Sequence, residues 1–209
     1  MLEIITVFSA RLLESLTPDQ ITELVDRDMD AMEQAAQRLL RLVGGRLMAT
    51  PGADDCTNFV SQALYWGYLP EVGGSSQTDL NQWWYNLNNQ TWSNTWTVAP
   101  DLRTFLLNRY ANDIFTVYGT SLSPTIGVYP PNPTVNVGDP LFYDWDYTSA
   151  PNQFTHATII VAYGTDPTSG WVGALVDSHS TNRYHAIWTL APYNSQYLTT
   201  EIDGVHITY

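Results

Sequence analysis

Residues 54–64 have the sequence DDCTNFVSQAL and include Cys56, the only cysteine among the 209 residues of the chain. Their apolar side chains recur at helical spacing, which predicts a helix with one apolar face. These side chains are Phe59, Val60, Ala63 and Leu64. Asp54 or Asp55 is the expected N-cap, its carboxylate accepting free N–H groups, and Gly67 is expected to end the helix in a left-handed conformation. Cys56 is therefore predicted to lie in the first helical turn.

The predicted position in the first helical turn favours a catalytic role for Cys56. The helix dipole and the orphan backbone N–H groups favour the thiolate form of a cysteine at this position, and the same N–H groups can hold an oxyanion. The alternative is a small buried core residue, the commonest role of a lone cysteine. The acidic residues before Cys56 and the polar Thr57 and Asn58 after it favour the catalytic interpretation.

The composition excludes several classes of protein. Apolar residues make up 44% of the chain and charged residues 14%, which is typical of a folded globular protein. The net charge is −13 and every basic residue is an arginine, so nucleic acid is not an expected partner. Without a run of 18 apolar residues no membrane span is predicted, and no signal peptide is recognised. Localisation stays open, although the richness in Asn, Ser, Thr and aromatic residues resembles an exported or envelope-associated protein.

The first part of the chain is predicted to be helical. Residues 1–50 are predicted to form a helical segment packed on the body, and residues 51–209 are predicted to form the main domain. Thr17 and Pro18 mark a helix start, and the amphipathic stripe that follows stops at Gly44. This stripe is expected either to pack or to present a docking face to a protein partner.

The later part of the chain is predicted to contain short helices and then strands. Residues 78–87 and 99–108 are predicted helices, the first carrying Trp83 and Trp84. Alternating and continuous apolar runs then predict strands. The predicted strands cover about residues 137–145, 157–163, 171–180, 184–190 and 205–209. Helices followed by an antiparallel sheet give an α+β fold with segregated layers.

The cysteine segment closely resembles the cysteine motif of the putative amidase domain family, which belongs with papain-like amidases and peptidases that include the NlpC/P60 and CHAP domains. Four further segments resemble family segments in the same order along the chain. They are SNTWTVAPDLRTFL at 93–106, GDPLFYDW at 138–145, HATIIV at 156–161 and HSTN at 179–182. The resemblance covers about residues 50–209 and implies a papain-like fold, with N-terminal helices packed on a C-terminal antiparallel β-sheet.

A cysteine nucleophile needs a base within hydrogen-bond reach and usually a third group that orients the base. His156 is the candidate base, because it stands at the entrance of a buried strand directly after a polar loop. The following hairpin should bring Asp177 and His179 to one face near His156. A carboxylate stabilises an imidazolium better, which favours Asp177. The resemblance instead implies His179, which we take as the third catalytic residue, with Asn182 as a further alternative.

Three residues are predicted to contact the substrate. The resemblance implies that Asp55 holds a substrate amine, a role compatible with N-capping. Trp83 and Trp96 belong to an aromatic-rich segment that could line a groove for a peptide or a sugar, with core packing as the alternative. The four histidines lack the spacing of a zinc site, so neither a metal nor another cofactor is expected.

These features together predict a cysteine-dependent amidase or peptidase that cleaves an amide bond by acyl transfer. The resemblance implies a peptide or peptidoglycan-like substrate from the cell wall. Two alternatives stay open. One is a catalytically silent papain-like binding module, and the other is a cargo or structural protein docked through its N-terminal helices.

Overall fold

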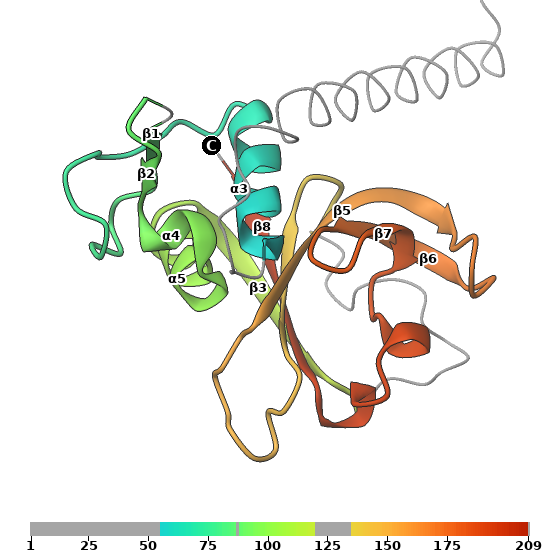
Figure 1. Cartoon of the computed structure of the whole chain (residues 1–209). Helices are drawn as coiled ribbons and strands as arrows, with labels where there is room; N and C mark the ends of the chain where they lie inside the picture. The colour runs from blue at the N-terminus through green and yellow to red at the C-terminus, as the bar shows by residue number, and fades with distance from the viewer. Residues whose placement is uncertain (1–54, 87, 120–134, 209) are drawn as a thin grey trace, which may run out of the picture. The chain divides into compact units, whose positions relative to one another are not determined.

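The computed structural model describes residues 55–86, 88–119 and 135–208 (Figure 1). The helices of these ranges are α3 (Cys56–Trp66), α4 (Asn94–Thr97) and α5 (Ala99–Arg109), with short 3-10 turns at Ala191–Tyr193 and Tyr197–Thr199. A small hairpin consists of β1 (Tyr85–Asn86) and β2 (Thr91–Trp92). The main sheet contains β3 (Ala111–Tyr118), β4 (Pro140–Asp144), β5 (His156–Thr165), β6 (Val172–Ser178), β7 (Arg183–Ile187) and β8 (Glu201–Ile207).

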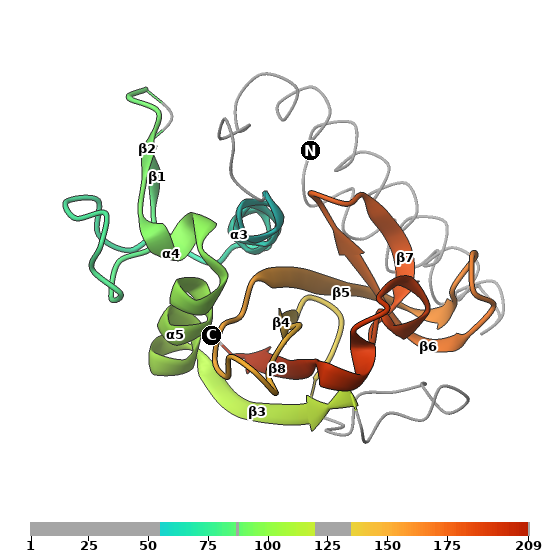
Figure 2. The same cartoon turned by 60° about the horizontal axis from the view of Figure 1, so that its bottom comes forward.

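The main sheet has six strands in the order β3-β8-β4-β5-β6-β7, and every neighbouring pair is antiparallel. Figure 2 shows the sheet strongly curved, with α3 and α5 over the same face. The mixed helix-and-sheet class and the antiparallel sheet are confirmed. The predicted helical segment of residues 1–50 lies outside the described residues. Within the described ranges, no helix combines the length and the apolar character that a bilayer span requires.

Two apolar cores form on the two faces of this sheet. Phe142 belongs to the first core and its neighbour Tyr143 to the second, as the alternation of side chains along a strand requires. The first core joins α3 and α5 to the sheet and includes Val60, Leu64, Trp83, Trp96, Leu102, Phe105 and Ile159. The second lies on the opposite face and includes Phe115, Leu141, Ile160, Val176 and Trp188. The start of α3 is thereby held against the sheet.

The predicted helix at residues 78–87 is wrong. Val72 and Trp83 exchange two backbone hydrogen bonds, of 2.7 and 2.8 Å, and β1 pairs with β2 in a hairpin. Asn86 Oδ1 accepts two backbone N–H groups of the turn that follows it. Such local side-chain-to-backbone bonds compete with helix formation, which explains why the apolar spacing misled the prediction.

The end of α3 also differs from expectation. Gly67 has φ −75°, outside the left-handed region, whereas Tyr68 has φ +72°. The N–H of Leu69 donates to Leu64 O at 3.0 Å and that of Tyr68 to Tyr65 O at 3.1 Å, which is the Schellman pattern. Leu64 and Leu69 are both buried in the first core, which is the apolar contact that accompanies this motif. Tyr68, between Gly67 and Leu69, therefore takes the left-handed conformation.

Candidate active site

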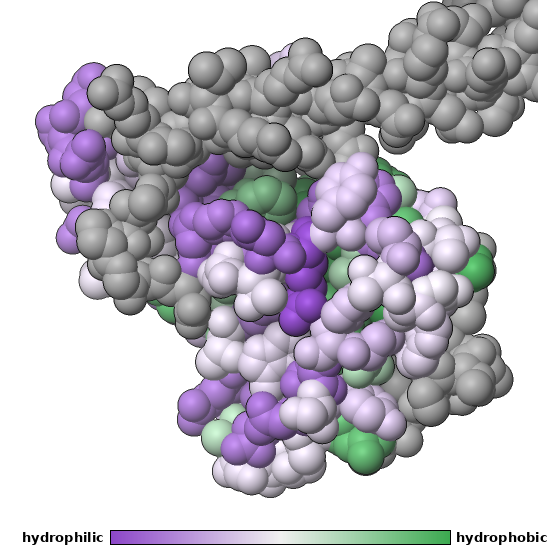
Figure 3. Space-filling view, turned by 45° about the vertical axis from the view of Figure 1, so that its right-hand side comes forward, coloured by the Kyte–Doolittle hydropathy of each residue, from purple (hydrophilic) through white to green (hydrophobic). Residues whose placement is uncertain are grey.

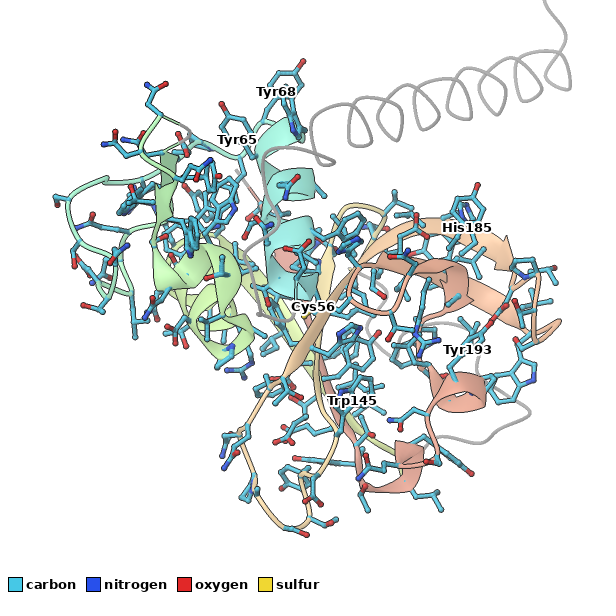
Figure 4. The ribbon with its side chains drawn as sticks, in the orientation of Figure 1. Cys56, Tyr65, Tyr68, Trp145, His185 and Tyr193 are labelled. Carbon is cyan, nitrogen blue, oxygen red and sulfur yellow. The ribbon has the colours of Figure 1, made fainter. Side chains whose placement is uncertain are left out.

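Cys56 is the first residue of α3, and only 1% of it is exposed. Its Sγ lies 3.7 Å from Thr57 Oγ1 and 3.9 Å from the carbonyl oxygen of Thr155. Thr155 directly precedes His156, which opens β5. Figure 4 shows Cys56 at the end of α3 that faces the sheet. The candidate nucleophile and the strand that starts with the candidate base therefore meet at this end of α3.

Asp55 occupies the N-cap position of α3, but the expected capping bond from its carboxylate is wrong. Its Oδ1 accepts a hydrogen bond from Asn58 Nδ2 at 2.7 Å, and its Oδ2 lies 2.8 Å from His179 Nδ1. The backbone N–H of Asp55 donates to Ser180 Oγ at 2.6 Å. The carboxylate thus turns towards side-chain donors and does not occupy the first-turn N–H groups, which is the arrangement that oxyanion binding needs.

His179 lies in the turn between β6 and β7, and its side chain is 50% exposed. Besides the contact with Asp55, its ring stacks on Phe59 with a centroid distance of 6.4 Å and an interplanar angle of 22°. These contacts tie the β6–β7 turn to the start of α3. The role of His179 in orienting His156 stays a prediction, because the described contacts of His179 are with Asp55 and Phe59.

The pairing of β5 with β6 differs from the hairpin arithmetic. Ile159 stands opposite Asp177, and a bulge follows Ile160, so Asp177 lies further into the sheet than His156. Asp177 Oδ1 accepts the backbone N–H of His185 at 2.7 Å, and the His185 Nδ1 lies 3.6 Å away. Beside Asp177 the register is shifted by two residues from the expected one, and on the turn side of the bulge it is shifted by three.

The imidazole of His156 lies in an aromatic corner that sequence reasoning missed. Tyr143 stands directly opposite on β4, with ring centroids 5.7 Å apart, and the Trp145 ring lies 5.6 Å from the imidazole. Tyr143 and Trp145 stack on each other at 4.9 Å, and Tyr143 Oη donates to Trp188 O at 2.6 Å. Burial raises the pKa of Tyr143, so its hydroxyl stays a neutral donor. The available signal was the spacing of two, which puts residues 143 and 145 on one face of a strand.

Trp83 and Trp96, predicted to contact substrate, are 0% and 1% exposed. Their rings stack at 4.6 Å in the first core, and an enclosed indole offers no surface to a ligand, so the core-packing alternative describes them. Trp96 Nε1 donates to Asn58 Oδ1 at 2.8 Å, and Trp83 Nε1 donates to Ser61 Oγ at 3.1 Å. Both indoles therefore hold polar side chains of α3 in place. Asn58, held by Trp96, in turn donates to the Asp55 carboxylate.

Other parts of the described surface are weaker candidates for a functional site. A small pocket at the far end of α3 is lined by Gly67, Asp139 and Ile207 among others, away from Cys56. Within residues 55–86, 88–119 and 135–208, no three His, Cys, Asp or Glu side chains are grouped to hold a metal ion. The face drawn in Figure 3 is largely hydrophilic or intermediate in colour, with hydrophobic residues scattered over it.

Comparison with known proteins gives a family for the chain. The profile of the putative amidase domain matches residues 47–201, well over half of the sequence. A curated relative, "Uncharacterized protein YhbB" of Bacillus subtilis (strain 168), is 30% identical over 110 residues, which are 53% of this chain and 30% of that protein. No solved structure matches significantly. The chain therefore belongs to the putative amidase domain family, whose description indicates hydrolysis of amide bonds in general.

Proposed function

We propose that this protein is a cysteine-dependent amidase or peptidase of the papain-like type, related to the NlpC/P60 and CHAP domains. The observation that carries the proposal is Cys56 at the first position of α3, with its Sγ 3.9 Å from the residue before His156. Membership of the putative amidase domain family supports an amide as the bond that is cleaved. A buried cysteine with no catalytic duty would not need a helix N-terminus beside a histidine.

In this proposal the Cys56 thiolate attacks the carbonyl carbon of the amide, and the carbonyl π electrons move to oxygen. The N–H groups of the first turn of α3 hold the oxyanion, since the Asp55 carboxylate is directed elsewhere. The His156 imidazolium protonates the leaving amine, which leaves a thioester on Cys56. Neutral His156 then takes a proton from water, the hydroxide attacks the thioester, and the acid product departs as the thiolate re-forms.

The residues around this pair receive supporting roles. His179 is proposed as the third catalytic residue, which keeps His156 in the productive orientation. Asp55, held by Asn58 and His179, is proposed to attract a substrate amine, since its side chain is 21% exposed beside the nucleophile. The overall net charge of −13 favours a substrate that carries positive charge.

The proposed substrate is a cell-wall peptide or another peptidoglycan-like amide, which comes from the family resemblance. The test is incubation of the full chain with purified peptidoglycan fragments, followed by mass spectrometry for new amines. The wild-type protein should release them and the Cys56→Ala variant should not. A second arm with unrelated peptides separates general amide hydrolysis from a cell-wall preference. New amines in equal amount from both proteins would overturn the cysteine assignment.

A further inference from the structure

We propose that Trp145 is a positioning residue for the proposed reaction, because its indole face stabilises the protonated imidazole of His156 and through it the thiolate of Cys56. This inference rests on the proposed function and adds to it a residue that acts on the electrostatics of the base.

The geometry at His156 suits a cation–π contact. The centroids of the Trp145 and His156 rings are 5.6 Å apart with an interplanar angle of 31°. Cation–π attraction operates within about 6 Å of the ring centroid, and tryptophan provides the strongest quadrupole of the aromatic residues. Since His156 is only 9% exposed, water screens the contact little.

The Trp145 indole is itself held in place from two sides. It stacks on Tyr143 at 4.9 Å and 26°, and Tyr143 is fixed by its bond to Trp188 O. The carbonyl oxygen of Trp145 accepts the hydroxyl of Thr199 at 2.9 Å, which anchors the backbone just past β4. In Figure 4, Trp145 lies at the end of the sheet that Cys56 faces. A ring fixed in this way acts on the imidazole at no ordering cost during the reaction.

A proposed thiolate–imidazolium pair makes such a contact useful. Burial disfavours an imidazolium, because desolvation penalises the charged form. A neutral aliphatic side chain in place of the indole would leave that penalty in full. The negative face of the indole reduces it, so more of the pair stays in the charged form at neutral pH.

Other groups also act on His156, and all remain in a Trp145 variant. The charged and titratable side chains on the elements packed around it include Asp55, Cys56, Tyr143, Asp144, Asp177, His179, Arg183 and His185. The difference between the wild-type protein and a Trp145 variant therefore isolates the indole.

The test uses the full chain and the rate at which iodoacetate alkylates Cys56, followed by intact mass against pH. Because Cys56 is the only cysteine, every thiol adduct reports this site, and the Cys56→Ala variant gives the background from other side chains. Iodoacetate is an anion, so its rate should rise as the thiolate forms and fall as His156 loses its proton. In Trp145→Leu the descending limb should move to lower pH by roughly half a unit to one unit, with the ascending limb in place.

Two further variants make the result specific. Trp145→Phe keeps a smaller ring and should shift the descending limb in the same direction by less. Trp171→Leu changes a partly buried tryptophan before β6, at the other end of the β5–β6 hairpin, and should leave both limbs unchanged. If Trp145→Leu fails to fold by circular dichroism, Trp145→Phe carries the test.

The outcomes separate the two proposals. A bell-shaped wild-type profile with an unmoved descending limb in the folded Trp145 variants overturns the role of Trp145 alone. A wild-type profile that rises only at the pH of an ordinary thiol, with no descending limb, overturns the proposed cysteine chemistry itself.

Discussion

Replacing Cys56 by alanine removes one sulfur atom from a buried position and leaves the helix start unchanged. We expect amidase activity to disappear while the free energy of unfolding changes by on the order of 1 kcal/mol, as for other small deletions in a core. Hydrolysis assays and urea denaturation of both proteins check this. Retention of most of the activity by the alanine variant would show that another group is the nucleophile.

The choice between His179 and Asp177 is the second test among single residues. His179→Ala should lower turnover by roughly 10²–10⁴-fold, because losing an orienting group leaves nucleophile and base in place. Asp177→Asn should cost much less, since its remaining oxygen still accepts the His185 N–H. The two variants are compared side by side after circular dichroism. If Asp177→Asn is the more damaged enzyme, the carboxylate is the third member.

Tyr68 is a third test, and it concerns stability alone. The residue has φ +72° and is 88% exposed, so its ring contributes little packing while its Cβ strains the backbone. Tyr68→Gly should raise the free energy of unfolding by about 0.5–1 kcal/mol, because glycine favours the left-handed position of a Schellman motif. Chemical denaturation measures it. Gly67→Ala serves as a contrast and should not stabilise, because its Cβ would lie 3.2 Å from Ala63 O.

Residue-level prediction from the sequence succeeded where the signal was local and failed where it was not. The first-turn position of Cys56 followed from the spacing of its neighbours and a nearby acidic residue. The partner of Asp55 did not, because His179 comes from a turn 124 positions later in the chain. The burial of Trp83 and Trp96 was likewise hidden, since an aromatic-rich segment is compatible with both a groove and a core.

Among the elements, the β5–β6 hairpin is locked to β7 through Asp166, whose side chain is fully buried. Burial on its own raises the pKa of Asp166, but hydrogen bonds from Tyr193 Oη and the backbone N–H groups of Ile187 and Thr168 outweigh it and lower the pKa to about 2. The hydrogen bonds of the folded state therefore stabilise the ionised carboxylate of Asp166.

The depressed pKa of Asp166 fixes the sign of a pH effect. Its stabilisation is fully present above the unfolded pKa near 4 and is lost as pH falls towards 2, with a magnitude on the order of 2 kcal/mol. The free energy of unfolding of Asp166→Asn should be lower at pH 7 and should lose less between pH 4 and pH 2 than that of the wild type. Equal acid sensitivity of the two proteins would contradict this assignment.

Prediction of elements worked best for α5 and for strands β4, β5 and β6, whose periodicity agrees with their tertiary setting. The helix at residues 78–87 failed because Asn86 and the Val72–Trp83 pairing direct the chain into a hairpin. The hairpin register failed because the turn is centred between Thr168 and Ser169 and not near Pro167. The bulge after Ile160 offsets one residue of that error, and no pattern of apolar positions reveals either feature.

In the whole molecule, one ionic cluster holds the helical layer to the sheet. Arg103 of α5 contacts the fully buried Asp203 of β8, with its Nη2 2.5 Å and its Nε 2.6 Å from Oδ2. Thr116 of β3 donates to the other oxygen at 2.6 Å, and the guanidinium lies over Phe154 at 4.7 Å. This cluster connects two strands and a helix.

Loss of the Asp203 carboxylate should therefore weaken the whole assembly. Asp203→Ala is expected to lower the free energy of unfolding by about 3 kcal/mol, the lower end for a broken buried pair, because Arg103 keeps 24% exposure. Asp146→Ala, at an exposed position after β4, is the matched control and should change it by about 0.5 kcal/mol or less. Equilibrium unfolding in urea compares the two variants. Similar small losses in both would show that the cluster contributes little.

The position of β8 has a consequence for how the protein is made. This strand follows all the other described strands, yet it lies between β3 and β4, so two edges of the sheet stay open until residues 201–207 arrive. A ribosome delivers these residues after the other described strands, and until then the nascent chain carries two unpaired strand edges that invite pairing with other chains. The sheet therefore closes after translation of β8, and a chaperone that shields exposed strand edges should act on every nascent chain truncated before residue 201.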